Sequence, residues 1–79
     1  MAELQTTLHD IAAAIVDSPD AVTVTREEDE TTITLTLSVA PEDMGMVIGR
    51  HGRIAKAIRS VMKSAATTAG KKVIVDIKD

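Results

Sequence analysis

Apolar residues recur at helical spacing near the start of the chain. Between about residues 3 and 17 they fall at Leu4, Leu8, Ile11 and Ile15, a spacing that lines one face of an amphipathic helix. The stretch "DSPD" then interrupts the pattern, and its proline, Pro19, disfavours helical conformation in the residue before it. The pattern therefore predicts a helix over about residues 3–17 that packs one face against a core.

The spacing then changes to strict alternation, which predicts two strands. Over about residues 21–27 valines alternate with threonines, and over about residues 31–40 four apolar residues alternate with Thr and Ser, namely Ile33, Leu35, Leu37 and Val39. Each strand is expected to bury one face only. The acidic run "EEDE", Glu27 to Glu30, separates the strands and is interpreted as the solvated turn of a hairpin.

The second half of the chain predicts two helices and a last strand. Pro41 and the acids after it are typical of a helix start, and a short helix is expected over about residues 42–48, up to Gly49. A longer helix follows over about residues 53–69, before a glycine of the kind that commonly ends helices. Alternation in "KKVIVDIK" predicts a strand over about residues 72–78.

These elements follow the order helix, strand, strand, helix, helix, strand within 79 residues. The length suits one domain, and no linker, internal repeat or low-complexity tract divides it. The predicted fold is therefore a single α+β domain over residues 1–79, in which three helices cover one face of a three-stranded sheet.

Composition narrows the chemistry that this domain can support. The chain has no Cys and no aromatic residue, so disulfides and cysteine-based zinc sites are excluded and the core must be aliphatic. The only histidines are His9 and His51. No acid–base pair, metal-ligand set or activated nucleophile stands out, so we expect no enzymatic activity, metal or cofactor. No apolar run approaches the roughly 20 residues of a membrane span, and no signal peptide is visible, which makes the cytoplasm the expected location.

Charge is distributed very unevenly along the chain. The formal net charge is −3, yet no Asp or Glu lies between Met44 and Val75, a stretch that holds most of the basic residues. Those basic residues are Arg50, Arg53, Lys56, Arg59, Lys63, Lys71 and Lys72. A protein polarised in this way can present a positive face to a polyanion despite its negative total.

The two later helices are joined by "GRHG", Gly49 to Gly52. Glycine permits backbone angles with positive φ and lets a ligand backbone approach closely. The free N–H groups and the positive dipole end of the following helix point at this loop, and Arg50, His51 and Arg53 add charge. This combination suits a phosphodiester backbone.

The helix after the loop carries a basic stripe. At about 100° per residue, the basic residues Arg53, Lys56, Arg59 and Lys63 fall within one arc, and apolar residues occupy the opposite arc. Alone, such a stripe is most simply a solvated helix face. Beside a Gly-x-x-Gly loop, and without acids, it favours a nucleic-acid ligand.

The stretch "VIGRHGRIAKAIR", residues 47–59, resembles the V-I-G-x-x-G-x-x-I core of KH domains, whose Gly-x-x-Gly loop clamps four nucleotides. The helix before the hairpin and the late position of the motif resemble the type II KH topology. With "SPDAVTV", "VAPEDMGMVIGRHGRIAKAIRSV" and "GKKVIVDI", nearly the whole chain is similar to the small stand-alone KhpA-like proteins of bacteria.

That resemblance implies a cytoplasmic, single-stranded RNA-binding protein, acting as a post-transcriptional regulator or RNA chaperone. It also implies a homodimer, or a pair with a second, larger KH-domain protein. It carries binding roles over to the loop and to apolar positions beside it at Ile48, Ile54 and Ile58. Together with the basic stripe, the expected RNA-binding residues are Ile48, Gly49, Arg50, His51, Gly52, Arg53, Ile54, Lys56 and Arg59.

A second hypothesis uses the same region differently. The small aliphatic core and the Met- and Ile-rich helix pair around the loop suit a module that acts mainly through dimerisation, with RNA contact secondary. The two hypotheses are compatible, since a dimer interface close to the loop would place two loops side by side.

Overall fold

The computed structural model describes residues 4–78, apart from the side chains of residues 68 and 69. Its elements follow the predicted order of helix, strand, strand, helix, helix and strand. They are α1 (Leu4–Ile15), β1 (Thr23–Glu28), β2 (Thr32–Ser38), α2 (Met44–Ile48), α3 (Arg53–Ala65) and β3 (Lys72–Lys78). Short 3₁₀ turns lie at Pro19–Ala21, Pro41–Asp43, Arg50–Gly52 and Ala66–Ala69.

The central strand of the sheet is β2, in the order β1-β2-β3. It pairs antiparallel with β1 and parallel with β3. Its alternating sequence buries Ile33, Leu35 and Leu37 almost completely, while its Thr and Ser residues lie on the other face and are only half-buried. The sheet therefore has one buried face, as the alternation predicts.

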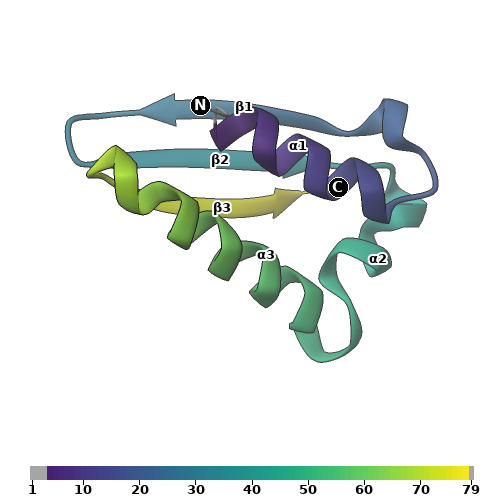
Figure 1. Ribbon diagram of the computed structural model, residues 1–79. Helices are drawn as coiled ribbons and strands as arrows, with labels where there is room; N and C mark the ends of the chain where they lie inside the picture. Colours follow the sequence, from purple (N-terminus) through teal and green to yellow (C-terminus); the bar gives the residue numbers. More distant parts are fainter. Residues whose placement is uncertain (1–3, 79) are drawn as a thin grey trace.

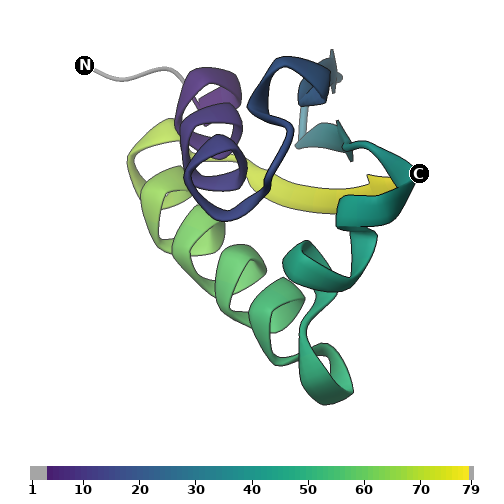
Figure 2. The ribbon, with the colours of Figure 1, turned by 90° about the vertical axis from the view of Figure 1, so that its right-hand side faces the viewer.

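All three helices lie on the buried side of this α+β fold. Both α1 and α3 cross the same face of the sheet (Figure 1), and the view in Figure 2 shows them on one side of the strands. The buried residues Leu8 of α1 and Met62 of α3 meet β2 in the core. The short helix α2 lies at the end of the sheet where β2 ends and is anchored by buried Val47. The connection from α2 to α3 therefore projects away from the sheet (Figure 1).

The element ends differ from the predicted ones for local reasons. Helix α1 ends at Ile15, and Pro19–Ala21 form a 3₁₀ turn, so that β1 begins only at Thr23. At the other end, α3 tightens into the 3₁₀ turn Ala66–Ala69 before Gly70, whose φ of 69° is left-handed. The predicted start of the first helix, at about residue 3, lies outside the described residues.

The acidic turn of the hairpin is shorter than the sequence predicts. Strand β1 runs on to Glu28, which pairs with Ile33, so the turn comprises residues 29–31. The side chain of Asp29 accounts for this, because its Oδ1 accepts hydrogen bonds from the N–H groups of Thr31 and Thr32 at 2.8 and 2.7 Å, the way in which Asp stabilises turns. Residues 27–30 are all exposed as expected, but the expected bounds of the turn, Glu27 to Glu30, are corrected to residues 29–31.

Candidate nucleic-acid interface

The loop from Gly49 to Gly52 turns the chain sharply from α2 into α3 (Figures 1 and 2). The N–H of Gly49 donates to the Gly45 carbonyl at 2.9 Å and closes α2, and the N–H of Gly52 donates to the Gly49 carbonyl at 3.1 Å. The φ angles of Gly49 and Gly52 are 75° and 73°, in a region that residues with a Cβ rarely adopt. The backbone path of the loop therefore depends on both glycines.

Space adds a second requirement at Gly49. A Cβ at this position would lie 2.6 Å from Cγ1 and 2.9 Å from Cβ of Ile54, whereas a Cβ at Gly45 or Gly52 would meet nothing within 4 Å. Gly49 therefore packs directly against the Ile54 side chain in the first turn of α3, with no space for a side chain of its own. At Gly52 the open space leaves room for a ligand to approach the backbone.

The tip of the loop presents Arg50 and His51 to solvent. His51 has φ 58° and ψ 25°, and it is the non-glycine residue with positive φ within the described part of the chain. Both side chains are exposed, and neither has an ion pair or hydrogen bond with the residues described. The structure thus brings a guanidinium and an imidazole to the tip without internal partners.

Helix α3 begins directly after the loop, at Arg53. Its N-cap residue is Gly52, and no side chain caps the first turn. The Arg53 N–H donates to the Arg50 carbonyl, and the other N–H groups of the first turn and the positive end of the helix dipole face the loop. Arg53, the first residue of α3, is exposed. The start of α3 therefore has the features of a helix N-terminus that binds anions.

Three cations of the predicted stripe are available for a ligand. Arg53, Lys56 and Lys63 are exposed on α3 and have no ion pair or side-chain hydrogen bond with the residues that the structure describes. No acid lies on α3, and the opposite side of this helix is buried. The stripe therefore leads away from the loop along the exposed face of α3.

Arg59 differs from the other cations of this stripe. Its Nε donates a hydrogen bond to the carbonyl oxygen of Val75 at 3.3 Å, which ties α3 to β3. The side chain as a whole remains exposed. Arg59 therefore combines a fixed nitrogen with outward-facing charge.

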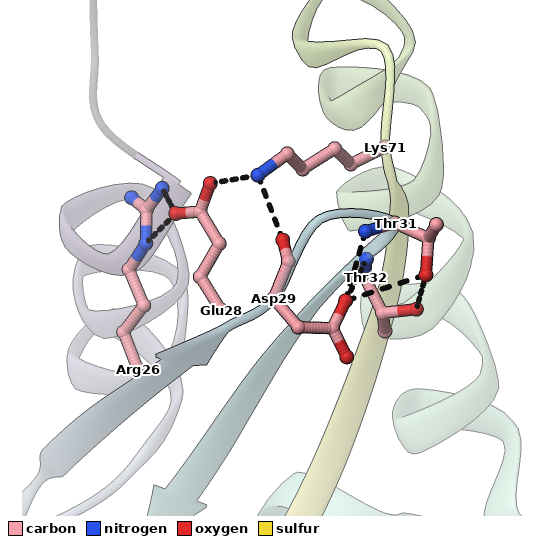
Figure 3. A network of polar contacts seen from close by, with 6 residues as sticks. All are labelled: Arg26, Glu28, Asp29, Thr31, Thr32 and Lys71. Atoms are coloured by element: carbon pink, nitrogen blue, oxygen red, sulfur yellow. Dashed lines mark hydrogen bonds and ion pairs between the residues drawn. The ribbon is translucent and has the colours of Figure 1, made fainter.

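Lys71, by contrast, is paired with groups of the protein itself. Its Nζ contacts a carboxylate oxygen of Glu28 and donates to the carbonyl of Asp29 at 2.8 Å (Figure 3). Arg26 pairs with the same carboxylate. The Lys71 ammonium, and secondarily the Arg26 guanidinium, hold the pKa of the Glu28 carboxyl below its usual range. The charge of Lys71 is thus offset locally and does not add to the positive face.

The apolar residues matched to the loop region divide between surface and core. Ile48 and Ile54 are 38% and 37% exposed and flank the loop. Ile58, which the resemblance also places beside the loop as a groove position, is only 3% exposed and belongs to the core. The apolar surface next to the loop therefore includes Ile48 and Ile54, and not Ile58.

A supporting residue that the sequence did not reveal is Asp43. Its side chain is 1% exposed, and its Oδ2 accepts a hydrogen bond from the N–H of Ser18 at 3.0 Å. This contact ties the connection after α1 to the residue that precedes α2. In the sequence Asp43 has the appearance of an ordinary acid at a helix start, because a partner 25 positions away leaves no local signal.

Within the described residues, no group of three or more His, Asp or Glu side chains is placed to hold a metal ion. Among those same residues, no helix has both the length and the apolar character to cross a membrane.

The chain matches known proteins over most of its length. The family described as KhpA/KhpB, KH domain, matches residues 5–77. The RNA-binding protein KhpA of Clostridium acetobutylicum is 56% identical over 70 residues, which cover 89% of this chain and 93% of that protein. The RNA-binding protein KhpA of Halalkalibacterium halodurans is 47% identical over 76 residues, covering 96% of this chain and 100% of that protein.

A solved structure has a similar fold. The crystal structure of Era from Aquifex aeolicus matches with a TM-score of 0.70 at 15% identity, and the match covers 94% of this chain and 29% of the Era chain. At that identity the likeness concerns the fold alone.

Proposed function

Because the chain belongs to the KhpA/KhpB family of KH domains, we propose that it binds single-stranded RNA by gripping the backbone with the Gly49–Gly52 loop and the basic face of α3. One observation carries this proposal above the others. Arg50 and Arg53 have no partner among the described residues, and they lie beside a helix start that no side chain caps.

The chemistry of the surface indicates how such an RNA would be held. Contacts to the backbone dominate, so binding weakens steeply with added salt. The chain has no aromatic residue, and bases therefore have no aromatic side chain to stack on. Exposed Ile48 and Ile54 offer an aliphatic surface for the bases of about four nucleotides held at the loop.

Charge reversal at the loop tip tests the grip. We expect the double variant Arg50→Asp with His51→Asp to lose RNA binding, because it replaces both tip residues by repelling carboxylates. The variant should remain folded, since both side chains are exposed and Asp tolerates the left-handed backbone of position 51. Fluorescence anisotropy with a short labelled RNA measures the affinity, and circular dichroism reports the fold.

A matched control separates a local effect from a change in total charge. Lys78→Asp changes the net charge by as much as Arg50→Asp, and Lys78 is exposed at the end of β3, on the face of the sheet without helices. We expect RNA affinity to fall in Arg50→Asp and to change little in Lys78→Asp. Undiminished RNA affinity in the folded double variant contradicts the proposal.

The cellular role that we propose is the one the family resemblance implies, a cytoplasmic post-transcriptional regulator or RNA chaperone. Crosslinking in cells followed by sequencing of the bound RNA tests this role. Recovery of many transcripts, dependent on Arg50 and His51, is the expected result. Recovery that does not depend on these residues contradicts the proposed binding mode.

A second candidate function, self-association, is favoured by an exposed apolar strip on α3. Ile54 and Val61 lie seven residues apart and therefore on one side of the helix, and Val61 is 51% exposed. The core-facing side of α3 separates this apolar strip from Arg59. A dimer that forms through the strip therefore leaves the basic stripe accessible. The resemblance also implies a second, larger KH-domain protein as a partner, and this strip is the surface that we propose for either partner.

Sedimentation at micromolar concentration tests self-association. We expect the wild type to sediment as a dimer and Val61→Asp as a folded monomer, because an exposed position accepts the carboxylate when the chain is alone but not in an apolar contact. A wild type that sediments as a monomer contradicts the homodimer.

A further inference from the structure

The contact between Arg59 and β3 occurs at the edge of the sheet. Among the described strands, β3 pairs with β2 alone. The N–H of Lys72 donates to the Thr31 carbonyl at 3.0 Å and therefore faces that neighbour. Because successive residues of a strand present their backbone groups to alternate sides, the backbone groups of Val75, three residues on, face the outer side. Arg59 thus covers one carbonyl on an open edge.

This hydrogen bond restricts the guanidinium of Arg59. A guanidinium carries its five N–H donors in one rigid plane, and the structure holds the Nε donor on Val75 at 3.3 Å. The remaining donors have no partner among the described residues. The contact therefore leaves the two Nη atoms as a planar fork on an exposed side chain, whereas Arg50 and Arg53 have no hydrogen bond or ion pair with the described residues that would orient them.

The position of the fork points to a base and not to the backbone held by the loop. Arg59 lies six residues after Arg53, about 9 Å along the helix axis, and it spans from α3 to β3. An RNA backbone gripped at the loop can direct a base to the boundary between α3 and the open edge of β3, within reach of the fork.

The fork selects among bases by its donors alone. Two parallel N–H donors match two adjacent acceptors, as in guanine with O6 and N7 or cytosine with N3 and O2. Adenine and uracil instead present a hydrogen-bond donor next to each acceptor on their base-pairing edges, so two parallel N–H donors do not match them. The chain has no aromatic residue on which a base could stack, and the aliphatic surface of Ile48 and Ile54 does not distinguish donors from acceptors.

We propose that Arg59 is the specificity-determining residue of the interface, held by the Val75 carbonyl so that its fork reads a guanine or a cytosine in the bound RNA. This inference rests on the proposed RNA-binding function. It assigns base selection to one side chain and leaves the backbone phosphates to the other cations of the proposed site.

The test compares short uridine-rich RNAs that carry a single guanosine, cytidine, adenosine or uridine at one position, titrated into the full chain by fluorescence anisotropy. We expect the wild type to prefer guanosine or cytidine over uridine on the order of tenfold, the discrimination of one bidentate contact. Arg59→Lys keeps the charge but loses the fork, so it should lose this preference while its salt dependence stays nearly unchanged. Arg53→Lys, on the same helix but without a carbonyl partner, should keep the preference.

The preferred nucleoside identifies the acceptor pair, and a modified base then tests the guanine contact without any change to the protein. If guanosine is preferred, 7-deazaguanosine lacks the N7 acceptor and should bind the wild type as weakly as uridine; if cytidine is preferred, N3 and O2 are the acceptors. Equal affinity for all four RNAs, a preference that survives in Arg59→Lys, or a guanosine preference unaffected by the deaza base overturns the inference while RNA binding stands. A wild type that binds none of the RNAs overturns the proposed function as well.

Discussion

Two chain reversals at opposite ends of the domain carry exposed charge, and they use it in different ways (Figures 1 and 3). At the Gly49–Gly52 loop, Arg50 and Arg53 have no partner among the described residues. At the hairpin turn, Lys71 is bound to Glu28 and to the carbonyl of Asp29. A cation is available to a ligand only where the turn beside it does not need that cation for its own structure.

The difference follows from what holds each end together. The loop is held by its backbone hydrogen bonds and by the packing of Gly49 against Ile54. Buried Val47 and Asp43, which precede the loop, anchor it to the rest of the domain. The hairpin turn is held by the Asp29 side chain and by exposed ion pairs that reach across to the start of β3. We therefore expect changes of surface charge to affect stability at the hairpin and ligand binding at the loop.

The largest effect on stability is expected from Gly49→Ala. The new Cβ meets Ile54 at 2.6 Å while φ is 75°, and the strain and overlap together should lower the free energy of unfolding by about 2–4 kcal/mol. Gly45→Ala is the control, because its Cβ meets nothing within 4 Å and alanine favours helix by up to about 1 kcal/mol. Urea unfolding measures both variants, and equal stability of the two would show that Gly49 does not seat the loop.

A smaller and opposite pair of effects is expected when one lysine is neutralised at each end. Lys71→Gln should lower the Tm slightly and leave RNA affinity unchanged, since it removes an exposed ion pair. Lys56→Gln should leave the Tm unchanged and reduce the slope of log affinity against log salt by about 0.7, the value for one phosphate contact of a single strand.

Thermal melts and RNA titrations at several salt concentrations measure both lysine variants. A loss of RNA affinity in Lys71→Gln equal to that in Lys56→Gln contradicts the division between the two ends. So does a Lys56→Gln variant with an unchanged salt slope.

The smallest effect is an acid-dependent loss of stability at the hairpin. Lys71 and then Arg26 lower the pKa of Glu28, and the N–H groups of Thr31 and Thr32 lower the pKa of Asp29. A carboxyl whose pKa is lowered by folding contributes stability above its unfolded pKa and loses it as the pH falls through the folded one. We expect the Tm to fall modestly through this acidic range, less so in Glu28→Gln and at high salt. If Glu28→Gln keeps the full acid dependence of the wild type, groups other than Glu28 are responsible for it.

Regular patterns carried most of the fold prediction. Alternation from Ile33 to Leu37 identified β2 and its buried face, and the positions of Leu8 and Met62 in their helical patterns agree with their place in the core. The ends of elements were less predictable, because a single side chain decides them. Asp29 restricts the hairpin turn to residues 29–31 by accepting hydrogen bonds from two backbone N–H groups.

The candidate interface divides in the same way. Local sequence identified Gly49 and Gly52 as residues that permit a positive φ in a tight turn between two helices, and both have a positive φ in the structure. Lys71 and Arg59 have the same appearance in the sequence as Lys56, yet the first is paired with Glu28 and the second is fixed to Val75. Residue type and spacing therefore determined the element order, the buried face and the loop. Only the tertiary structure decided which cations are free, because their partners are 43 and 16 positions away along the chain and meet them only when the sheet and α3 pack together.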